Sequence, residues 1–534
     1  MAAPLTLGGL LRGVDGARSA NAGFAALPIA EVRDDSRQVR PGDLFIAVPG
    51  TAADGRNFVA DAAARGAVAL VVQELVQELV QEQTRTPTQV EFPAVVVTVP
   101  NARHALGVIA ANRFGAAEAL TLLAVTGTNG KTTTAYLIEE MLRASGRAPG
   151  LFGTITYRAA GLAGGGRVAP LTTPGALMLH GLLADMRAVG TTDVVLEATS
   201  HALAQGRLDG CRFRVAALTN LTQDHLDYHQ TMGEYENAKA ILFERLIDPI
   251  HGVAVTFADD EAGRRMHGRA KASARLTVAR APGPEARGAD VVVARHVFDP
   301  HGTHATVETP IGKLEITTPL VGGYNLDNLA LAVGMSVARG IAADAIVAGA
   351  ARLPGVPGRL ERVANARGLL CLVDYAHTPD ALSRAIAAVR PLVASSPTIR
   401  GRLIVVFGCG GDRDRGKRPL MGEIAVRDAD LAVVTSDNPR TEEPASIVAM
   451  IVDGIRRAGG NELTSAALPG ATRGYHVEVD RRAAIRAAAA AARSGDVLLI
   501  AGKGHEDYQI VGTQRLHFDD REEAAQALAA GGGA

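Results

Sequence analysis

The stretch LLAVTGTNGKTTT, from Leu122 to Thr134, decides the fold of the middle of this chain. It begins with a short apolar run, which is typical of a strand buried on both faces. The segment TGTNGKTTT follows, with two glycines, one lysine and a run of three threonines at its end, and then the helical segment AYLIEEML. Strand, glycine-rich turn, lysine and helix in this order predict a phosphate-binding loop, in which backbone N–H groups and a helix N-terminus face the phosphates.

The sequence of this loop departs from the usual pattern GxxxxGK[ST], because Gly127 lies only three residues before Gly130. A glycine-rich turn that contains a lysine by chance is the alternative, and the complete context makes it the weaker one. We expect Lys131 to reach the outer phosphates of ATP and the Thr132 hydroxyl to ligate Mg²⁺. The predicted ATP-binding residues of the loop are Gly127, Thr128, Asn129, Gly130, Lys131, Thr132 and Thr133.

Apolar runs like this one alternate with alanine-rich helical segments along the whole chain, which predicts an α/β fold with parallel, helix-covered sheets. The expected strands cover residues 94–99, 122–125, 193–196, 403–407, 430–434 and 497–501. Turn residues near position 100 and the Pro/Gly-rich segment 353–359 mark two boundaries. We therefore expect three domains, 1–103, 104–354 and 355–534. A period-four repeat at residues 75–83 receives no chemical role.

Composition excludes several classes of protein. The 534 residues include 55 Lys and Arg against 56 Asp and Glu, so a nucleic-acid-coating or membrane-surface protein is disfavoured. No apolar stretch approaches the roughly 20 residues of a membrane span. Three scattered cysteines fit a reducing compartment, and we expect a cytoplasmic protein, with a monomer favoured over an oligomer.

Acidic and histidine side chains follow two of the apolar stretches. Glu197 ends one expected strand, and His225 lies in DHLDYH after the next apolar stretch, so both are expected to hold Mg²⁺ against a triphosphate. Only six of the 55 basic residues are lysines, and one of them, Lys239, lies in the helical segment YENAKAILF. A lysine in a chain that otherwise uses arginine suggests chemistry that needs a primary amine able to lose its proton.

In this order the motifs resemble the Mur ligase family, the ATP-dependent amide-bond-forming enzymes of peptidoglycan precursor synthesis. The resemblance covers most of the chain. It rests on DSR at 35–37, PGDLF at 41–45, DGRNF at 54–58, the phosphate loop, LTTP at 171–174, EATSH at 197–201, DHLDYH at 224–229, YENAK at 235–239, GYNLDN at 323–328, PGR at 357–359, VDYAHTPD at 373–380, GCGGDRDRGKRP at 408–419, DNPR at 437–440 and GKGHE at 502–506.

The resemblance implies a central P-loop ATPase domain between a UDP-sugar-binding N-terminal domain and a Rossmann-like, amino-acid-binding C-terminal domain. It implies that Lys239 is carbamylated and that the metal site comprises Thr132, Glu197, His225 and Lys239, with Lys131 also catalytic. Further nucleotide contacts would come from Asn325, Arg359 and Asp374. The muramoyl-peptide substrate would be bound by Ser36, residues 51–53, Thr172, Thr173, Thr199, Gln205 and Arg207, although Asp34 and Thr51 depart from the residues expected there.

The tetrapeptide DNPR is carried by diaminopimelate-adding members of the family, whereas lysine-adding members differ there. Diaminopimelate has a second carboxylate at its far end, which an arginine fork matches bidentately. The residues implied for this amino acid are Arg413, Asp437, Asn438, Pro439, Arg440, Gly502 and Glu506.

The expected reaction forms ADP. The D-glutamyl carboxylate of UDP-N-acetylmuramoyl-L-alanyl-D-glutamate attacks the γ-phosphate of ATP, and the amine of meso-diaminopimelate then displaces phosphate from the acyl phosphate. His377 is a candidate general base for the amine. Two alternatives stay open: a sister ligase that adds L-lysine or another amino acid, or a P-loop regulatory NTPase that turns over ATP without any amine acceptor.

Overall fold

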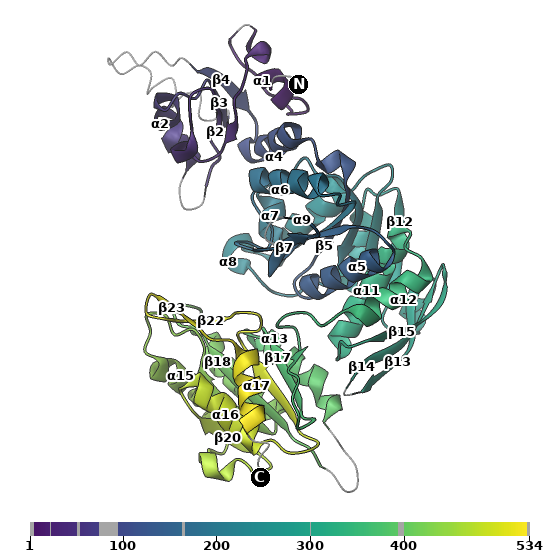
Figure 1. The fold of residues 1–534 in the computed structure, drawn as a ribbon, viewed down its shortest axis with the longest axis vertical. Coiled ribbons are helices and arrows are strands. Elements are labelled where there is room, and N and C mark those ends of the chain that lie inside the picture. The colour runs from purple at the N-terminus through teal and green to yellow at the C-terminus, as the bar shows by residue number, and fades with distance from the viewer. Residues whose placement is uncertain are drawn as a thin grey trace. The chain divides into compact units, whose positions relative to one another are not determined.

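The computed structural model describes residues 5–21, 23–50, 54–73, 94–162, 166–299, 301–393 and 400–530 (Figure 1). The repeat at 75–83 and the predicted uridine-contacting turn at 51–53 lie outside these residues. The chain forms two structural units. Unit 1 comprises residues 1–292, 309–312 and 331–349, and unit 2 comprises 293–308, 313–330 and 350–534.

The helices and strands alternate along the sequence. The strands are β1 (Val32–Arg33), β2 (Leu44–Ile46), β3 (Ala69–Gln73), β4 (Val95–Val99), β5 (Thr121–Thr126), β6 (Pro149–Phe152), β7 (Thr156–Ala159), β8 (Arg167–Val168), β9 (Asp193–Glu197), β10 (Phe213–Leu218), β11 (Val253–Phe257), β12 (Ala274–Ala279), β13 (Val291–Asp299), β14 (Gly302–Thr309), β15 (Gly312–Thr318), β16 (Glu361–Arg362), β17 (Leu370–Asp374), β18 (Leu403–Cys409), β19 (Leu431–Ser436), β20 (Gly474–Val477), β21 (Val497–Ala501), β22 (Tyr508–Val511) and β23 (Gln514–His517). The helices are α1 (Leu7–Leu10), α2 (Val59–Ala64), α4 (Ala102–Phe114), α5 (Lys131–Ala144), α6 (Ala176–Ala188), α7 (Ser200–Ala204), α8 (Leu226–His229), α9 (Met232–Ile241), α10 (Glu261–Arg269), α11 (Gly323–Arg339), α12 (Ala343–Arg352), α13 (Pro379–Val389), α14 (Lys417–Asp428), α15 (Pro444–Arg457), α16 (Arg481–Ala491) and α17 (Asp520–Ala530).

Unit 1 contains one parallel sheet and most of a mixed sheet. The first has the order β1-β2-β3-β4. In the second, β12-β11-β10-β5-β9-β6 are parallel neighbours, and β7 and β8 follow antiparallel. The strand of the phosphate loop, β5, therefore lies between β9 and β10, so the loops after these three strands emerge side by side at one edge of the sheet.

Unit 2 is built around the sheet β16-β17-β21-β18-β19-β20, in which only β16 is antiparallel. Side chains of β18 alternate between two cores. Leu403, Val405 and Phe407 pack with α13, α14 and α15 on one face, whereas Ile404 and Val406 pack with α16 and α17 on the other. Strands buried on both faces explain the continuous apolar runs, and the predicted α/β class is confirmed.

All six strands expected from the sequence are present, at β4, β5, β9, β18, β19 and β21, with ends that differ by at most two residues. In the described part of the chain, no helix combines the length and apolar character that crossing a membrane requires.

Candidate functional site

The phosphate loop has the conformation that its sequence predicts. Gly127 and Gly130 have φ values of 140° and 89°, a region that favours glycine. A Cβ at Gly127 would lie 1.9 Å from the Thr219 hydroxyl oxygen, so a side chain has no room there. Helix α5 begins at Lys131, directly after Gly130. The predicted residues 127–133 thus form one turn at a helix N-terminus, as an anion-binding loop requires.

Lys131 folds back over this loop, where its Nζ donates to the carbonyl oxygens of Gly127 and Thr128, both at 2.9 Å. The loop is also tied to its neighbours, because the Thr128 hydroxyl lies 3.1 Å from the Tyr235 hydroxyl and the Asn129 N–H donates to Asn220 Oδ1 at 3.1 Å. The cationic side chain is therefore held over the turn that would receive the phosphates.

Glu197 ends β9 and is fully buried. Its Oε2 accepts hydrogen bonds from the Thr132 and Thr154 hydroxyls, both at 3.0 Å, and its Oε1 accepts from the Thr154 N–H at 2.9 Å. The parallel register of β5 and β9 places Val125 beside Glu197, which brings the end of β9 to the loop. Two of the four predicted metal ligands, Thr132 and Glu197, are thus in direct contact.

Lys239 is buried on α9, a helix that starts with a capping threonine at Thr231. Its Nζ donates to the Gly127 carbonyl oxygen at 2.9 Å and lies 4.3 Å from the centre of the Tyr235 ring. Burial lowers the pKa of Lys239 well below its ordinary value, and the charge of Lys131 acts in the same direction. The site therefore favours a neutral amine, the form that reacts with carbon dioxide to give a carbamate.

His225 has a left-handed backbone, with φ 53°, and immediately precedes α8. Its ring lies 4.8 Å from the ring of His201 and 6.2 Å from that of Tyr235. Burial lowers the pKa of His225, and Lys131 and Lys239 contribute to this shift, so the neutral imidazole that a metal ligand needs is favoured.

Among the described residues, no three His, Cys, Asp or Glu side chains gather into a metal-holding group. The four predicted metal ligands are one carboxylate, one imidazole, one hydroxyl and a lysine, which would supply an oxygen only after carbamylation. A hydroxyl and a carboxylate that already share a hydrogen bond supply the oxygen ligands that Mg²⁺ prefers. These residues fit a magnesium ion.

The residues predicted for the muramoyl peptide form a chain of contacts that begins at Glu197. The Thr173 hydroxyl donates to the Glu197 backbone carbonyl at 2.7 Å and lies 3.2 Å from the Thr199 hydroxyl. Arg207 Nη1 donates to the Thr173 carbonyl oxygen at 2.9 Å, and Arg207 Nη2 donates to Gln205 Oε1 at 2.7 Å. Thr172 joins the same group, since its hydroxyl lies 3.2 Å from that of Thr154.

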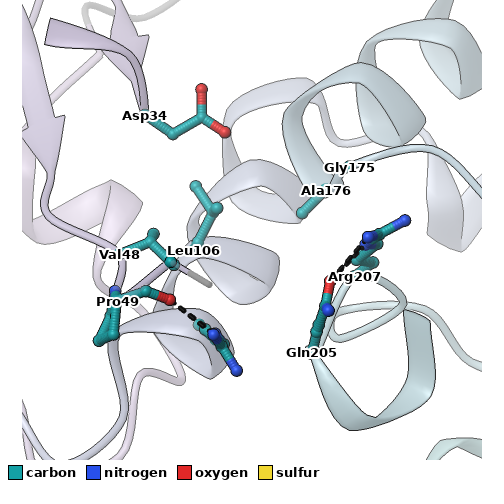
Figure 2. Close-up of a pocket in the computed structure, with 11 residues that line it drawn as sticks. Asp34, Val48, Pro49, Leu106, Gly175, Ala176, Gln205 and Arg207 are labelled. Atoms are coloured by element: carbon teal, nitrogen blue, oxygen red, sulfur yellow. Dashed lines mark hydrogen bonds between the residues drawn. The ribbon is translucent and has the colours of Figure 1, made fainter. Parts of the chain in front are cut away.

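Gln205 and Arg207 line a cavity of about 220 Å³, shown in Figure 2. Asp34, Val48 and Pro49 lie on the opposite wall. Asp34, the residue that departs from the family pattern, is therefore placed where it faces the predicted substrate residues. Ser36 is buried and hydrogen-bonds Asp61, so its side chain is committed to the fold of this part of the chain.

Tyr228 contacts one of the residues predicted for the muramoyl peptide. Its hydroxyl oxygen accepts a hydrogen bond from Gln205 Nε2 at 3.3 Å. We expect Tyr228→Phe to raise the KM for the UDP-linked dipeptide about two- to tenfold, since one neutral hydrogen bond is lost. The KM for ATP should stay within twofold. Steady-state kinetics with each substrate varied in turn tests this, and an equal rise in both KM values would contradict it.

The remaining nucleotide residues lie in unit 2. Asp374 ends β17, where its Oδ2 accepts from the Leu360 N–H at 2.8 Å and its Oδ1 accepts from the Ala376 N–H at 2.9 Å. Arg359 lies with its guanidinium carbon 5.1 Å from the centre of the Tyr375 ring. Asn325 is buried, and its Nδ2 donates to the Val321 carbonyl oxygen. Arg359 and Asp374 thus lie near each other around residues 358–376, whereas the Asn325 amide is bonded to the backbone that leads into its own helix.

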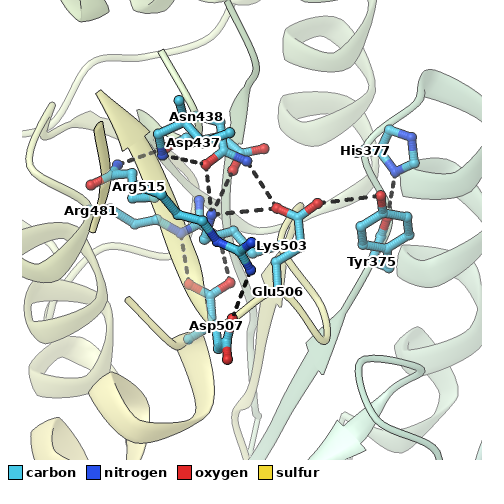
Figure 3. Close-up of polar contacts among 12 residues, drawn as sticks. Tyr375, His377, Asp437, Asn438, Arg481, Lys503, Glu506, Asp507 and Arg515 are labelled. Atoms are coloured by element: carbon cyan, nitrogen blue, oxygen red, sulfur yellow. Dashed lines mark hydrogen bonds and ion pairs between the residues drawn. The ribbon is translucent and has the colours of Figure 1, made fainter. Parts of the chain in front are cut away.

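Asp437, Asn438 and Glu506 form one polar cluster with Lys503, shown in Figure 3. Asp437 and Asn438 follow β19, and Lys503 and Glu506 follow β21. Burial alone would raise the pKa of Asp437, but the charges of Lys503 and Arg481 outweigh it and lower the pKa. Burial raises the pKa of Glu506. The buried carboxylate of Asp437 and the half-buried carboxylate of Glu506 thus lie beside one ammonium group, an arrangement that could also accept a further ammonium group.

Arg440 and Arg413 flank Gly410 beside this cluster. A Cβ at Gly410 would lie 2.9 Å from Arg440 Nη1 and 3.8 Å from Arg413 Cγ. Arg440 Nη1 donates to the Gly411 carbonyl oxygen at 2.8 Å, and Arg413 is exposed. Gly502 has φ 123° and lies against the Asp437 carboxylate, while Pro439 separates Asn438 from Arg440. Guanidinium groups and carboxylates therefore occur together, as a zwitterionic ligand requires.

His377, the candidate base, hydrogen-bonds the Tyr375 carbonyl oxygen through Nδ1 at 2.8 Å. Burial lowers the pKa of His377, so the imidazole is neutral near pH 7. Its own backbone carbonyl accepts from Lys417 Nζ at 2.7 Å. The side chain has the protonation state that a base needs.

Sequence reasoning assigned no role to Lys503, Tyr375 or Arg481. Arg481 is fully buried, pairs with Asp520 at 2.6 Å, and donates to the carbonyl oxygens of Ser436 and Ala501. It thereby fixes the last residues of β19 and β21. Lys503 and Tyr375 lie within two motifs of the family resemblance, at 502–506 and 373–380, and lysine is scarce in this chain, whereas nothing in the sequence pointed to Arg481.

Comparisons with known proteins agree over most of the chain. Three family models match it: "Mur ligase family, catalytic domain" at residues 28–114, "Mur ligase middle domain" at 125–336 and "Mur ligase, glutamate ligase domain" at 358–504. A Gloeobacter violaceus protein named UDP-N-acetylmuramoyl-L-alanyl-D-glutamate--2,6-diaminopimelate ligase is 47% identical over 505 residues, 94% of each chain. A Geobacter sulfurreducens protein of the same name is 44% identical over 92% of this chain and 93% of its own. A solved structure with this name superimposes with a TM-score of 0.69 at 32% identity, covering 98% of this chain and 99% of that one.

Proposed function

Since this chain belongs to the Mur ligase family, we propose that it is an ATP-dependent, ADP-forming ligase that adds meso-diaminopimelate to UDP-N-acetylmuramoyl-L-alanyl-D-glutamate. Such a reaction serves peptidoglycan precursor synthesis. The observation that carries the proposal is the cluster of Asp437, Asn438 and Glu506 beside Arg440. It combines acceptors for an ammonium group with a guanidinium for a carboxylate, and meso-diaminopimelate carries both kinds of group at each end.

The first step brings two anions together, because a carboxylate attacks the γ-phosphate of a triphosphate. Lys131 and the N-terminus of α5 would supply positive charge and N–H donors for the phosphates. Arg207, with Gln205, lies beside Thr173 and is suited to hold the D-glutamyl end in place. Holding both reactants in this way removes most of the entropic cost of the encounter.

Magnesium would be held by Thr132, Glu197, His225 and a carbamylated Lys239. A bound Mg²⁺ supplies charge neutralisation for the phosphate oxygens. The low pKa of Lys239 and its place beside the Gly127 carbonyl support carbamylation, because only the neutral amine can add carbon dioxide.

The second step needs a neutral amine, which then attacks the acyl phosphate. Asp437, Asn438 and Glu506 would bind and orient the amino acid, and Arg440 with Arg413 would hold a carboxylate. His377 is the residue that we assign, as a proposal, to accept the proton released by the amine.

We further propose three domains, 1–103, 104–354 and 355–534, a monomer, and a cytoplasmic location. The three matched segments support the domains, since they fall at 28–114, 125–336 and 358–504. The proposed substrates, ATP and a UDP-linked precursor, support the location.

One experiment tests the function against its rivals. The full chain is incubated with ATP, Mg²⁺, the UDP-linked dipeptide and one amino acid at a time, and phosphate release and product mass are measured together. We expect an amide product with meso-diaminopimelate and little with L-lysine. Product with lysine alone would indicate a sister ligase, and phosphate release without any new amide would indicate a regulatory NTPase.

A further inference from the structure

Lys503 is completely buried in unit 2, at the centre of the cluster in Figure 3. Its Nζ lies 3.1 Å from Asn438 Oδ1, 3.4 Å from Asp437 Oδ1 and 3.7 Å from Glu506 Oε2. A buried ammonium costs several kcal/mol to desolvate unless it is paired and hydrogen-bonded. The chain therefore maintains this cation within a set of acceptors that it also needs for its substrate.

The Asn438 amide has a single possible orientation beside Lys503. Its Oδ1 accepts from Lys503 Nζ and also from the Ile510 N–H at 2.9 Å. Because an ammonium and a backbone N–H are both donors, the atom between them has to be the carbonyl oxygen. Nδ2 consequently faces Glu506 and donates to its Oε2 at 2.9 Å.

Glu506 is thereby anchored through one oxygen. Oε2 receives the Asn438 amide and lies near Lys503, whereas Oε1 has the longer contact with the Tyr375 hydroxyl, at 3.5 Å. The charges of the neighbouring side chains also favour an ammonium group at Glu506. Asp437 and Glu506 carry two negative charges, Lys503 neutralises one, and Arg481 is neutralised by Asp520. Arg440 also acts on the charge of Glu506, and the proposed function assigns its guanidinium to the substrate carboxylate, which leaves Glu506 as the acceptor for the substrate ammonium group.

We propose that Lys503 is a positioning residue for the amine substrate: it fixes the Asn438 amide, which anchors Glu506 through Oε2 and directs Oε1 toward the substrate ammonium group. The inference rests on the proposed function, because it assigns the amine to this cluster. The effect of burial on Glu506 supports it, since burial raises the pKa of this carboxyl group and Lys503 opposes the shift.

Lys503→Met tests the proposal in the full-length chain. We expect the KM for meso-diaminopimelate to rise about 10- to 100-fold, the loss typical of a hydrogen bond to a charged group. The KM values for ATP and for the UDP-linked dipeptide should stay within about twofold, which a general structural defect would not allow. The control is Lys313→Met, because Lys313 is an exposed lysine that pairs with Glu315 at 3.3 Å; its kinetics should be unchanged.

A double-mutant cycle with Asn438→Ala shows whether Lys503 acts through Asn438. The double variant should be at most about twofold worse than Asn438→Ala alone, since the interaction is already lost there. Losses that multiply would overturn the proposal, as would an unchanged KM in Lys503→Met.

Lys503→Gln keeps a donor of similar reach and extends the test should the methionine variant not fold. We expect it to retain more affinity for the amino acid than Lys503→Met, and equal losses in both would contradict the positioning role. A wild-type chain that forms no amide product would refute the proposed function, whereas product with an unchanged KM in Lys503→Met would refute only this inference. Should the wild-type chain use lysine, the same cycle is measured with lysine, since the inference concerns the ammonium group.

Discussion

Replacing Lys239 by arginine is expected to reduce kcat by at least about 10²-fold, the order of loss seen when one preorganised electrostatic group is removed from an active site. A guanidinium stays charged and cannot form a carbamate. The native amine is buried and has a strongly lowered pKa, so it is available to add carbon dioxide. Arginine at this position would also place a fixed positive charge beside Lys131, where a carbamate would place a negative one.

The matching experiment separates this effect from misfolding. In Lys239→Ala, which removes the amine without adding charge, millimolar acetate or another short carboxylic acid should restore part of the activity by supplying the missing carboxylate. Lys271→Arg, at an exposed position of the same unit, should leave kcat unchanged. Full activity in Lys239→Arg would rule out the carbamate.

Replacing Arg440 by alanine is expected to remove most of the discrimination between meso-diaminopimelate and L-lysine. We expect kcat/KM for meso-diaminopimelate to fall by about 10²-fold or more, because a bidentate, charge-assisted contact is lost. Within the described part of the chain, the hydrogen bonds of this guanidinium come from Nη1, toward the carbonyl oxygens of Gly411 and Asn438. Its orientation is therefore set by the backbone before any ligand arrives.

Competition between the two amino acids in one reaction, with products resolved by mass, measures this ratio directly. Arg457→Ala is the control, because Arg457 is an exposed arginine of the same unit that pairs with Glu423 at 3.1 Å. An unchanged product ratio in Arg440→Ala would assign the discrimination to another residue.

The sequence predicts most of the fold because buried parallel strands have a simple signature. The runs at 122–125 and 193–196 are continuous and apolar, and the structure places them in adjacent strands, β5 and β9. Glu197, at the end of β9, was expected to lie near the phosphate loop, and its carboxylate accepts a hydrogen bond from the Thr132 hydroxyl at the start of α5.

The roles of Lys503 and Arg481 were harder to predict, because the residues that they contact depend on the order of strands in the sheet. Lys503 meets Asp437 across 66 positions of sequence. Periodicity identifies β19 and β21 as strands, but it does not show that both lie next to β18. Arg481 and Asp520 are similarly unremarkable as isolated charges until α16 and α17 pack together.

The buried pair of Arg481 and Asp520 sets a practical limit on how the chain can be shortened. Asp520 is the first residue of α17, and Arg481 holds the backbone immediately before Asp437 and Gly502. Proteolysis or redesign that removes residues 520–530 would leave an arginine buried without its counter-ion, a change that typically costs about 3–5 kcal/mol. Helix α17, which begins 80 residues after Arg440, therefore stabilises the proposed amino-acid pocket without contacting its ligand, and a shortened chain used for ligand screening needs to retain it.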